Sequence, residues 1–165
     1  MVSASGVVYV HSAPTALCPH IEWALARVLR VPARLHWDGQ PVEPGTWRGE
    51  FTWTGPVGTS AALASALRGC QRARFEVTED PTTGGLGERY AFTPRLGMFH
   101  ATTAANGDIM ISEQRLRAAV AANALGEGDL GQAVGELLGA EWDEELEIFR
   151  QGGVAGGVRW LNRAG

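Results

Sequence analysis

The stretch HSAPTALCPH, residues 11–20, places two histidines and a cysteine within ten positions. A cysteine thiolate is a nucleophile, and a nearby histidine can take its proton, so Cys18, His11 and His20 are the catalytic candidates. Cys18 precedes Pro19 at an expected helix start, where the helix dipole lowers the pKa of a thiol. No Asn or Asp that would orient the base is evident, and a small buried capping cysteine is the alternative interpretation.

A second helix start could join the first in binding an anion. Gly58, Thr59 and Ser60 stand between an expected strand and an expected helix. If the strands that precede the two helices are parallel neighbours, both helix starts offer free N–H groups at one sheet edge. Internal caps that satisfy these donors are the competing interpretation. The candidate residues for a small anionic ligand are His11, Cys18, His20, Gly58, Thr59 and Ser60.

Metal and lysine chemistry are not predicted. His11, Cys18, His20 and His100 are of the types that bind zinc, but the spacing His-x6-Cys-x-His matches no common zinc pattern. All 14 basic residues are arginines, which excludes a Schiff-base lysine and a P-loop lysine within this chain. We therefore expect no metal and no cofactor.

The elements that must position these residues alternate between strand and helix patterns. Apolar or alternating runs predict strands near residues 7–10, 35–37, 51–54 and 73–77, with helices after Pro19 and after Thr59 or Ser60. This β-α-β-β-α-β order over residues 6–79 is that of the ferredoxin-like unit. We predict an α+β protein with this core, in which the first and third strands are parallel neighbours.

The second half of the chain predicts an antiparallel extension of the sheet, followed by helices. Strand patterns cover residues 90–93, 96–102 and 109–111, and Asn106-Gly107 is a strong hairpin signal. Ser112 caps a helix that ends at Gly126, and two more apolar periodicities follow. We divide the chain into an α+β domain (1–126), an acidic helical extension (127–151) and a Gly-rich tail with Trp160 (152–165).

Charge follows the same division. Residues 1–126 carry a net +1 and residues 127–165 a net −5, which together make the net charge of −4. Nucleic-acid binding is disfavoured because no basic stripe is present to neutralise phosphates. The acidic segment is typical of a solvated helix face, or of a surface that docks a basic partner. The candidate partner-binding residues are Trp142, Glu144, Glu145 and Trp160.

Several features predict a cytoplasmic protein without a membrane segment. No apolar run approaches the roughly 18 residues that span a bilayer. The start, MVSASG, lacks the basic and apolar regions of a signal peptide. Cys18 and Cys70 form no CxxC motif, which favours free thiols in a reducing compartment.

Four long segments of the chain carry a family resemblance: GVVYVHSAPTALCPHIEWAL, FTWTGPVGTSAALASALRG, RFEVTED and LGMFHATTAANGDIMISEQRLRAA. Together they resemble an actinobacterial family known as domain of unknown function 3145. The family supplies no assigned activity and no catalytic residues. Because its members are often encoded near fatty-acid synthesis genes, the resemblance implies a partner such as an acyl carrier, acyl-CoA or carboxylase component.

Two functional hypotheses follow. The first is a non-enzymatic protein-binding or regulatory subunit, with a possible link to fatty-acid or acyl-CoA metabolism. The second is a small enzyme that acts on an anionic or acyl-thioester substrate. It would use Cys18 as the nucleophile, His11 or His20 as the base, and the amides of residues 58–60 to stabilise charge.

Overall fold

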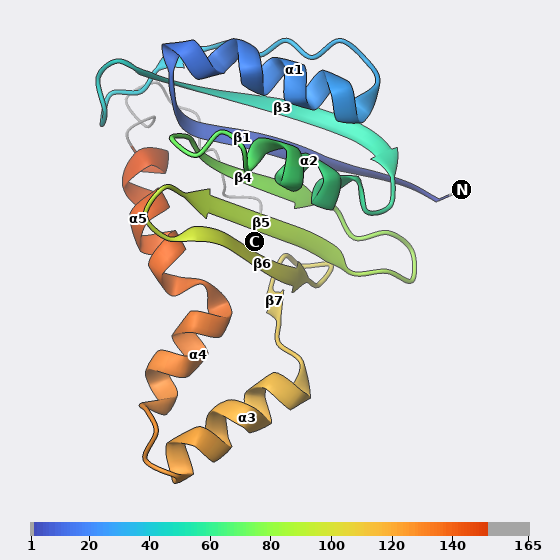
Figure 1. The fold of residues 1–165 in the computed structure, drawn as a ribbon. Helices are drawn as coiled ribbons and strands as arrows, with labels where there is room; N and C mark the ends of the chain where they lie inside the picture. The colour runs from blue at the N-terminus through green and yellow to red at the C-terminus, as the bar shows by residue number, and fades with distance from the viewer. Residues whose placement is uncertain (1, 152–165) are drawn as a thin grey trace.

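The computed structural model describes residues 2–151, which form one seven-stranded antiparallel sheet with α-helices on both faces (Figure 1). The α+β class, the antiparallel extension and the C-terminal helices are confirmed. Across the sheet the strands are β2 (Asp38–Gly39), β3 (Thr46–Pro56), β1 (Ser3–Pro14), β4 (Arg74–Glu79), β5 (Gly87–Thr93), β6 (Gly97–Thr103) and β7 (Ile109–Met110).

The prediction that the first and third strands are parallel neighbours is wrong. β1 and β3 are neighbours but antiparallel, with Ser3 opposite Pro56 and Pro14 opposite Thr46. After α1 (Cys18–Leu29) the chain forms only the short β2 and turns through a hairpin into β3. The four strands of the expected core lie in the order β2-β3-β1-β4 with every neighbouring pair antiparallel, and the finer ferredoxin-like assignment stays a prediction.

The alternating residues near 35–37 do not form a strand, because they are anchored on α1. Glu22 Oε1 accepts hydrogen bonds from the backbone N–H of Leu35 at 3.0 Å and from Trp37 Nε1 at 3.1 Å. Leu35 is buried in the same core as α1. The alternating pattern therefore belongs to a segment that packs along a helix, and the short strand β2 begins at the next residue, Asp38.

One face of the sheet is covered by α1 and α2 (Thr59–Leu67) (Figure 1). A single 3-10 turn, Thr15–Leu17, connects β1 to α1. The helices and strands contribute alternate apolar residues to a single core, as the periodicities predict. Its fully buried side chains include Val8, Val10, Ile21, Leu25, Leu63, Leu67, Phe75 and Val77.

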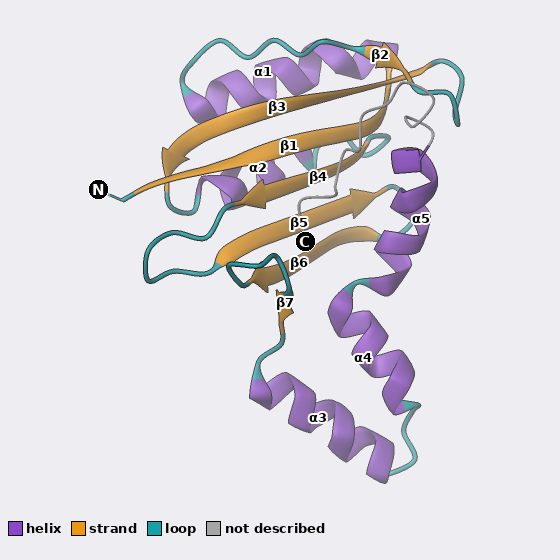
Figure 2. Ribbon diagram, turned by 180° about the vertical axis from the view of Figure 1, so that it is seen from behind, coloured by secondary structure: helices purple, strands orange, loops and turns teal. Residues whose placement is uncertain are grey.

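The opposite face is covered at one end by α5 (Ala140–Gln151) (Figure 2). Consecutive strand residues point to opposite faces. Phe92 belongs to the core under α1 and α2, whereas Ala91 packs with Leu146 of α5. Gly139, between the end of α4 and the start of α5, has φ of 75°, and a Cβ there would lie 2.7 Å from the Phe99 ring, so the turn requires glycine.

Along the chain, β7 is followed by a helical hairpin of α3 (Glu113–Ala124) and α4 (Leu130–Leu138), and α5 comes after it. The hairpin projects away from the sheet in both views (Figures 1 and 2). The predicted cap is confirmed, since Ser112 Oγ accepts a hydrogen bond from Arg115 N at 3.3 Å. The predicted domain boundary at residue 126 lies in the turn between α3 and α4.

Residues 152–165, the predicted tail with Trp160, lie outside the described residues. None of the helices within residues 2–151 is long and apolar enough to cross a membrane.

Candidate functional site

The structure does not bring Cys18 and His11 together. Cys18 is buried in the core under α1, where its Sγ donates to Pro14 O at 3.7 Å. His11 Nε2 contacts the carboxylate of Glu76. The neighbours of Glu76 on β4, Phe75 and Val77, point into the core under α1. Glu76 and His11 therefore lie on the opposite face, which is covered by α5. The two candidates lie on opposite faces of the sheet.

The predicted fall in the pKa of Cys18 is also wrong. Burial, and then the nearby Glu22 carboxylate, raise the pKa of the Cys18 thiol above its ordinary value. The helix start does not lower the pKa enough to compensate, because the free-energy cost of removing a thiolate from water exceeds its attraction to the partial positive charge of the helix N-terminus. His20 is exposed, and its ring meets Trp23 edge-on at 5.1 Å.

The composite anion site predicted from two helix starts does not form. Because β1 and β3 are antiparallel, α1 and α2 begin at opposite ends of the sheet. The α2 start already holds a carboxylate of this chain: Glu79 accepts hydrogen bonds from Gly58 N (2.9 Å), Ser60 N (3.0 Å) and Ser60 Oγ (2.7 Å). Thr59 Oγ1 donates to Pro56 O at 2.6 Å. The donors are therefore satisfied internally.

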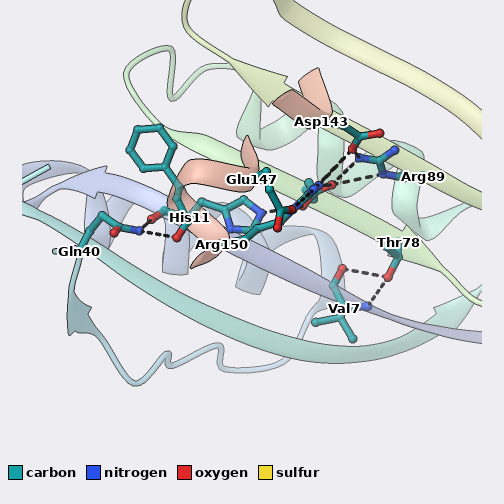
Figure 3. Close-up of polar contacts among 10 residues, drawn as sticks. Val7, His11, Gln40, Thr78, Arg89, Asp143, Glu147 and Arg150 are labelled. Carbon is teal, nitrogen blue, oxygen red and sulfur yellow. Dashed lines mark hydrogen bonds and ion pairs between the residues drawn. The ribbon is translucent and has the colours of Figure 1, made fainter. Parts of the chain in front are cut away.

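A cluster of buried charges lies between the sheet and α5 (Figure 3). Glu76, 2% exposed, receives His11 Nε2 at 2.6 Å, Arg89 Nη2 at 2.7 Å and Arg150 Nη2 at 2.6 Å. Asp143 of α5 adds a second carboxylate, 2.7 Å from Arg89 and 3.4 Å from Arg150. We call His11, Glu76, Arg89, Asp143 and Arg150 the ion cluster.

The ion cluster keeps Glu76 ionised. Burial alone raises the pKa of its carboxyl, but the hydrogen bond and charge of His11, with Arg150 and Arg89, hold that pKa well below the ordinary range. Both carboxylate oxygens are occupied by donors. This arrangement stabilises a fixed charge and clamps α5 to the sheet, and it leaves the carboxylate no vacant oxygen with which to accept a substrate proton.

Two of the predicted partner-binding residues also hold α5 in place. Trp142 Nε1 donates to Gly97 O at 2.9 Å, and its ring packs on Phe99 at 5.3 Å. Glu145 lies 3.4 Å from Arg74 Nε and 3.2 Å from Arg95 Nε. Glu144 is exposed on α5, and Trp160 lies outside the described residues.

Sequence reasoning missed Glu76, Arg89 and Arg150. Glu76 stands between Phe75 and Val77, and an acid in that position of a strand usually faces solvent. One signal was present: Asp143 and Arg150 are seven residues apart, on the same side of the helix as Leu146. The buried stripe of α5 therefore carries charges that need partners on the sheet.

No metal site is found in the described part of the chain, where no three His, Cys, Asp or Glu side chains are placed to hold an ion. His100, which was considered with the N-terminal histidines, pairs instead with Glu88 across β5 and β6 and stacks on Tyr90.

The α3–α4 hairpin is the least buried region of the described chain. Neither helix contains a buried residue, and α3 packs mainly on α4. Leu116 and Val120, one turn apart on α3, are 41% and 50% exposed. Leu125 at the tip is 74% exposed. This arrangement leaves apolar side chains in water on two short helices that have little support from the body.

The comparisons with known proteins give one match. The model of a family described as "Protein of unknown function (DUF3145)" matches residues 7–163. No curated protein and no solved structure matches the chain.

Proposed function

This chain belongs to the DUF3145 family of unknown function, and from its surface we propose that it is a non-enzymatic protein-binding subunit that docks a partner through the α3–α4 hairpin. The observation that carries the proposal is the exposed apolar stripe of this projecting hairpin. Exposed apolar groups that cluster on a protruding element are typical of protein interfaces.

Helix stability supports the same proposal. Isolated helices shorter than about 12–15 residues are marginal in water, and most helices are stabilised by packing of an apolar face. α3 and α4 have 12 and 9 residues, with no buried residue in either. A partner that covers Leu116 and Val120 would supply the missing packing.

The proposal is tested by capturing partners from cells that produce the chain. We expect the tagged full chain to retain a stoichiometric partner, and Leu116→Gln with Val120→Gln to reduce its recovery by about tenfold or more, because the anchors of an interface dominate its energy. Glutamine keeps good helix propensity, so α3 should persist by circular dichroism.

Ala118→Gln with Ala121→Gln is the matched control. Both alanines are exposed on the far side of α3 from Leu116. We expect the control to retain the partner at the wild-type level. Equal recovery by wild-type and Leu116→Gln/Val120→Gln proteins would rule out the hairpin as the docking element.

A link to fatty-acid or acyl-CoA metabolism is part of this proposal and rests on the family resemblance. The identity of the captured partner tests it directly. Recovery of an acyl carrier or a carboxylase component would support the link, and recovery of a partner from unrelated metabolism would contradict it.

The enzyme hypothesis is the alternative, and its nucleophile can be tested separately. Burial raises the pKa of Cys18, so we expect iodoacetamide to label it more slowly than a free model thiol at neutral pH. The Cys70→Ala background isolates the Cys18 signal. Rapid labelling with an apparent pKa below about 8.5 would restore Cys18 as a candidate nucleophile.

A further inference from the structure

The layer formed by α1 and α2 carries a basic surface. Within residues 15–37 and 57–73 the only acid is Glu22, which is half-buried and bound to Leu35 N and Trp37 Nε1. The arginines of this layer are all exposed: they are Arg27, Arg30, Arg34, Arg68 and Arg72. We call these five residues, together with Trp23, the basic face.

Most of these arginines have no partner in the described part of the chain. Arg34 contacts Glu22 at a long 3.7 Å, and no other arginine of the basic face has an ion pair within residues 2–151. Several arginines elsewhere in residues 2–151 do have carboxylate partners. Carboxylates contact Arg74, Arg89, Arg95, Arg117 and Arg150.

An aromatic anchor lies in line with an arginine on α1. His20, Trp23 and Arg27 follow one another at spacings of three and four, so they share the outward side of α1, and Arg30 follows in a left-handed conformation (φ 57°) just after the helix ends. Trp23 is 64% exposed, an unusual state for the side chain that most often dominates interfaces. The combination of exposed tryptophan and arginine is typical of protein-binding surfaces.

Next to the outward side of α1, the exposed side of α2 carries only small side chains, which form a shallow strip. Ala61, Ala62 and Ser65 are exposed on α2, and the basic Arg68 directly follows the last residue of this helix. α1 and α2 pack side by side on the sheet (Figure 1). A rod-shaped ligand could therefore lie along the strip, against Trp23 and between arginines at both ends.

We propose that the basic face binds an acidic amphipathic helix of a partner protein. Acidic side chains at spacings of three or four would meet the unpaired arginines, and an apolar side chain between them would pack on Trp23. The net charge of −4 disfavours nucleic acid as the occupant. This surface is separate from the α3–α4 hairpin, so a chain that uses both surfaces would bridge two partners.

Site-specific photo-crosslinking tests this inference in the full chain. p-Benzoylphenylalanine replaces Trp23, the cells are irradiated, and the crosslinked peptide is identified by mass spectrometry. We expect a peptide from another protein that carries Asp and Glu at helical spacing. Arg27→Gln with Arg30→Gln should lower the yield by about tenfold, because both charges are lost from one end of the contact, next to Trp23.

The matched control is Thr52→Glu with Thr54→Glu, two exposed changes on β3 that alter the net charge equally. The control should keep the yield within about twofold of wild type. Leu116→Gln with Val120→Gln should also leave this crosslink intact, which separates it from the hairpin proposal. The inference is overturned by a crosslink to a second copy of this chain, to nucleic acid or to a non-acidic peptide, by no crosslink, or by equal loss in the control.

Discussion

Arginine has opposite surroundings on the two sides of the sheet. Under α5, Arg89 and Arg150 are mostly buried and share the carboxylates of Glu76 and Asp143. On the α1–α2 layer, Arg27 and Arg68 are exposed and have no ion pair within the described residues. Arginine thus forms buried ion pairs within the fold on one side of the sheet and is exposed to solvent on the other.

The comparison shows why charge counts alone do not locate a binding surface. The C-terminal segment is the most acidic part of the sequence, yet Asp143 and Glu145 are occupied by arginines of the same chain. The α1–α2 layer has fewer charges, but four of its five arginines have no ion pair within residues 2–151. A partner protein is recognised by charges that the fold leaves unpaired, because only these gain a new interaction on binding.

The largest expected effect is that of Glu76→Gln. Removing this carboxylate leaves His11, Arg89 and Arg150 without their shared counter-charge, and breaking a buried ion pair costs about 3–5 kcal/mol. Urea unfolding measures the free energy of unfolding. Glu43→Gln is the control, because Glu43 is only half-buried and its partner Arg74 also contacts Glu145. A loss below about 1 kcal/mol in Glu76→Gln would contradict the clamp.

Acid should remove the contribution of the ion cluster in a predictable direction. The folded pKa of Glu76 is depressed, so its ionisation stabilises the fold above the unfolded glutamate pKa of about 4.3, and this contribution declines as pH falls toward the folded pKa. One protonation changes the free energy of unfolding by at most about 1.4 kcal/mol per pH unit, so between about pH 4 and pH 2.5 we expect a loss of up to about 2 kcal/mol from this group.

Glu76→Gln provides the reference for that titration. The variant has no carboxyl to protonate at this position, so its free energy of unfolding should fall less steeply with acid than that of the wild type. Parallel acid profiles for the two proteins would show that Glu76 is not the group responsible.

Glu79→Gln should have a smaller effect than Glu76→Gln. Glu79 accepts from backbone and hydroxyl donors of Gly58 and Ser60 rather than from cations. A glutamine at this position has only one acceptor oxygen and can accept only some of these three hydrogen bonds. We therefore expect the free energy of unfolding to fall by about 1–2 kcal/mol. A loss as large as that of Glu76→Gln would show that the cap and the ion cluster contribute equally.

The smallest expected effect lies on the basic face. Arg27→Gln with Arg68→Gln removes two exposed charges that have no ion pair within the described residues, so thermal unfolding should report a change within about 0.5 kcal/mol. A clear destabilisation would mean that these arginines stabilise the fold, and the contrast between the two sides of the sheet would then disappear.

The elements of this protein were largely predictable because they depend on local chemistry. The cap at Ser112, the glycine end at Gly126 and the turn at Asn106-Gly107 all occur where the sequence indicates them. Each is determined by hydrogen bonds or by φ angles within a few residues. The apolar periodicities likewise predicted the helices and the α+β class.

The candidate site was less predictable because its contacts join residues far apart in the sequence. Glu76 looked like a solvent-facing strand residue until α5 covered it, and its partners lie 65 residues before it and 74 after it. Cys18 looked like an activated thiol, but burial in the α1 core raises its pKa. Burial and long-range pairing depend on how the elements pack, and no local pattern encodes them.

The amino-acid sequence by itself determined where the helices and all but one of the predicted strands form, the absence of lysine chemistry and the division of charge along the chain. Only the tertiary structure decided that β1 and β3 run antiparallel, which separates the two helix starts. It also decided which charges are paired inside the fold and which remain on the surface. The physical reason is that local propensities act within a few residues, whereas strand direction and charge pairing depend on neighbours that only packing brings together.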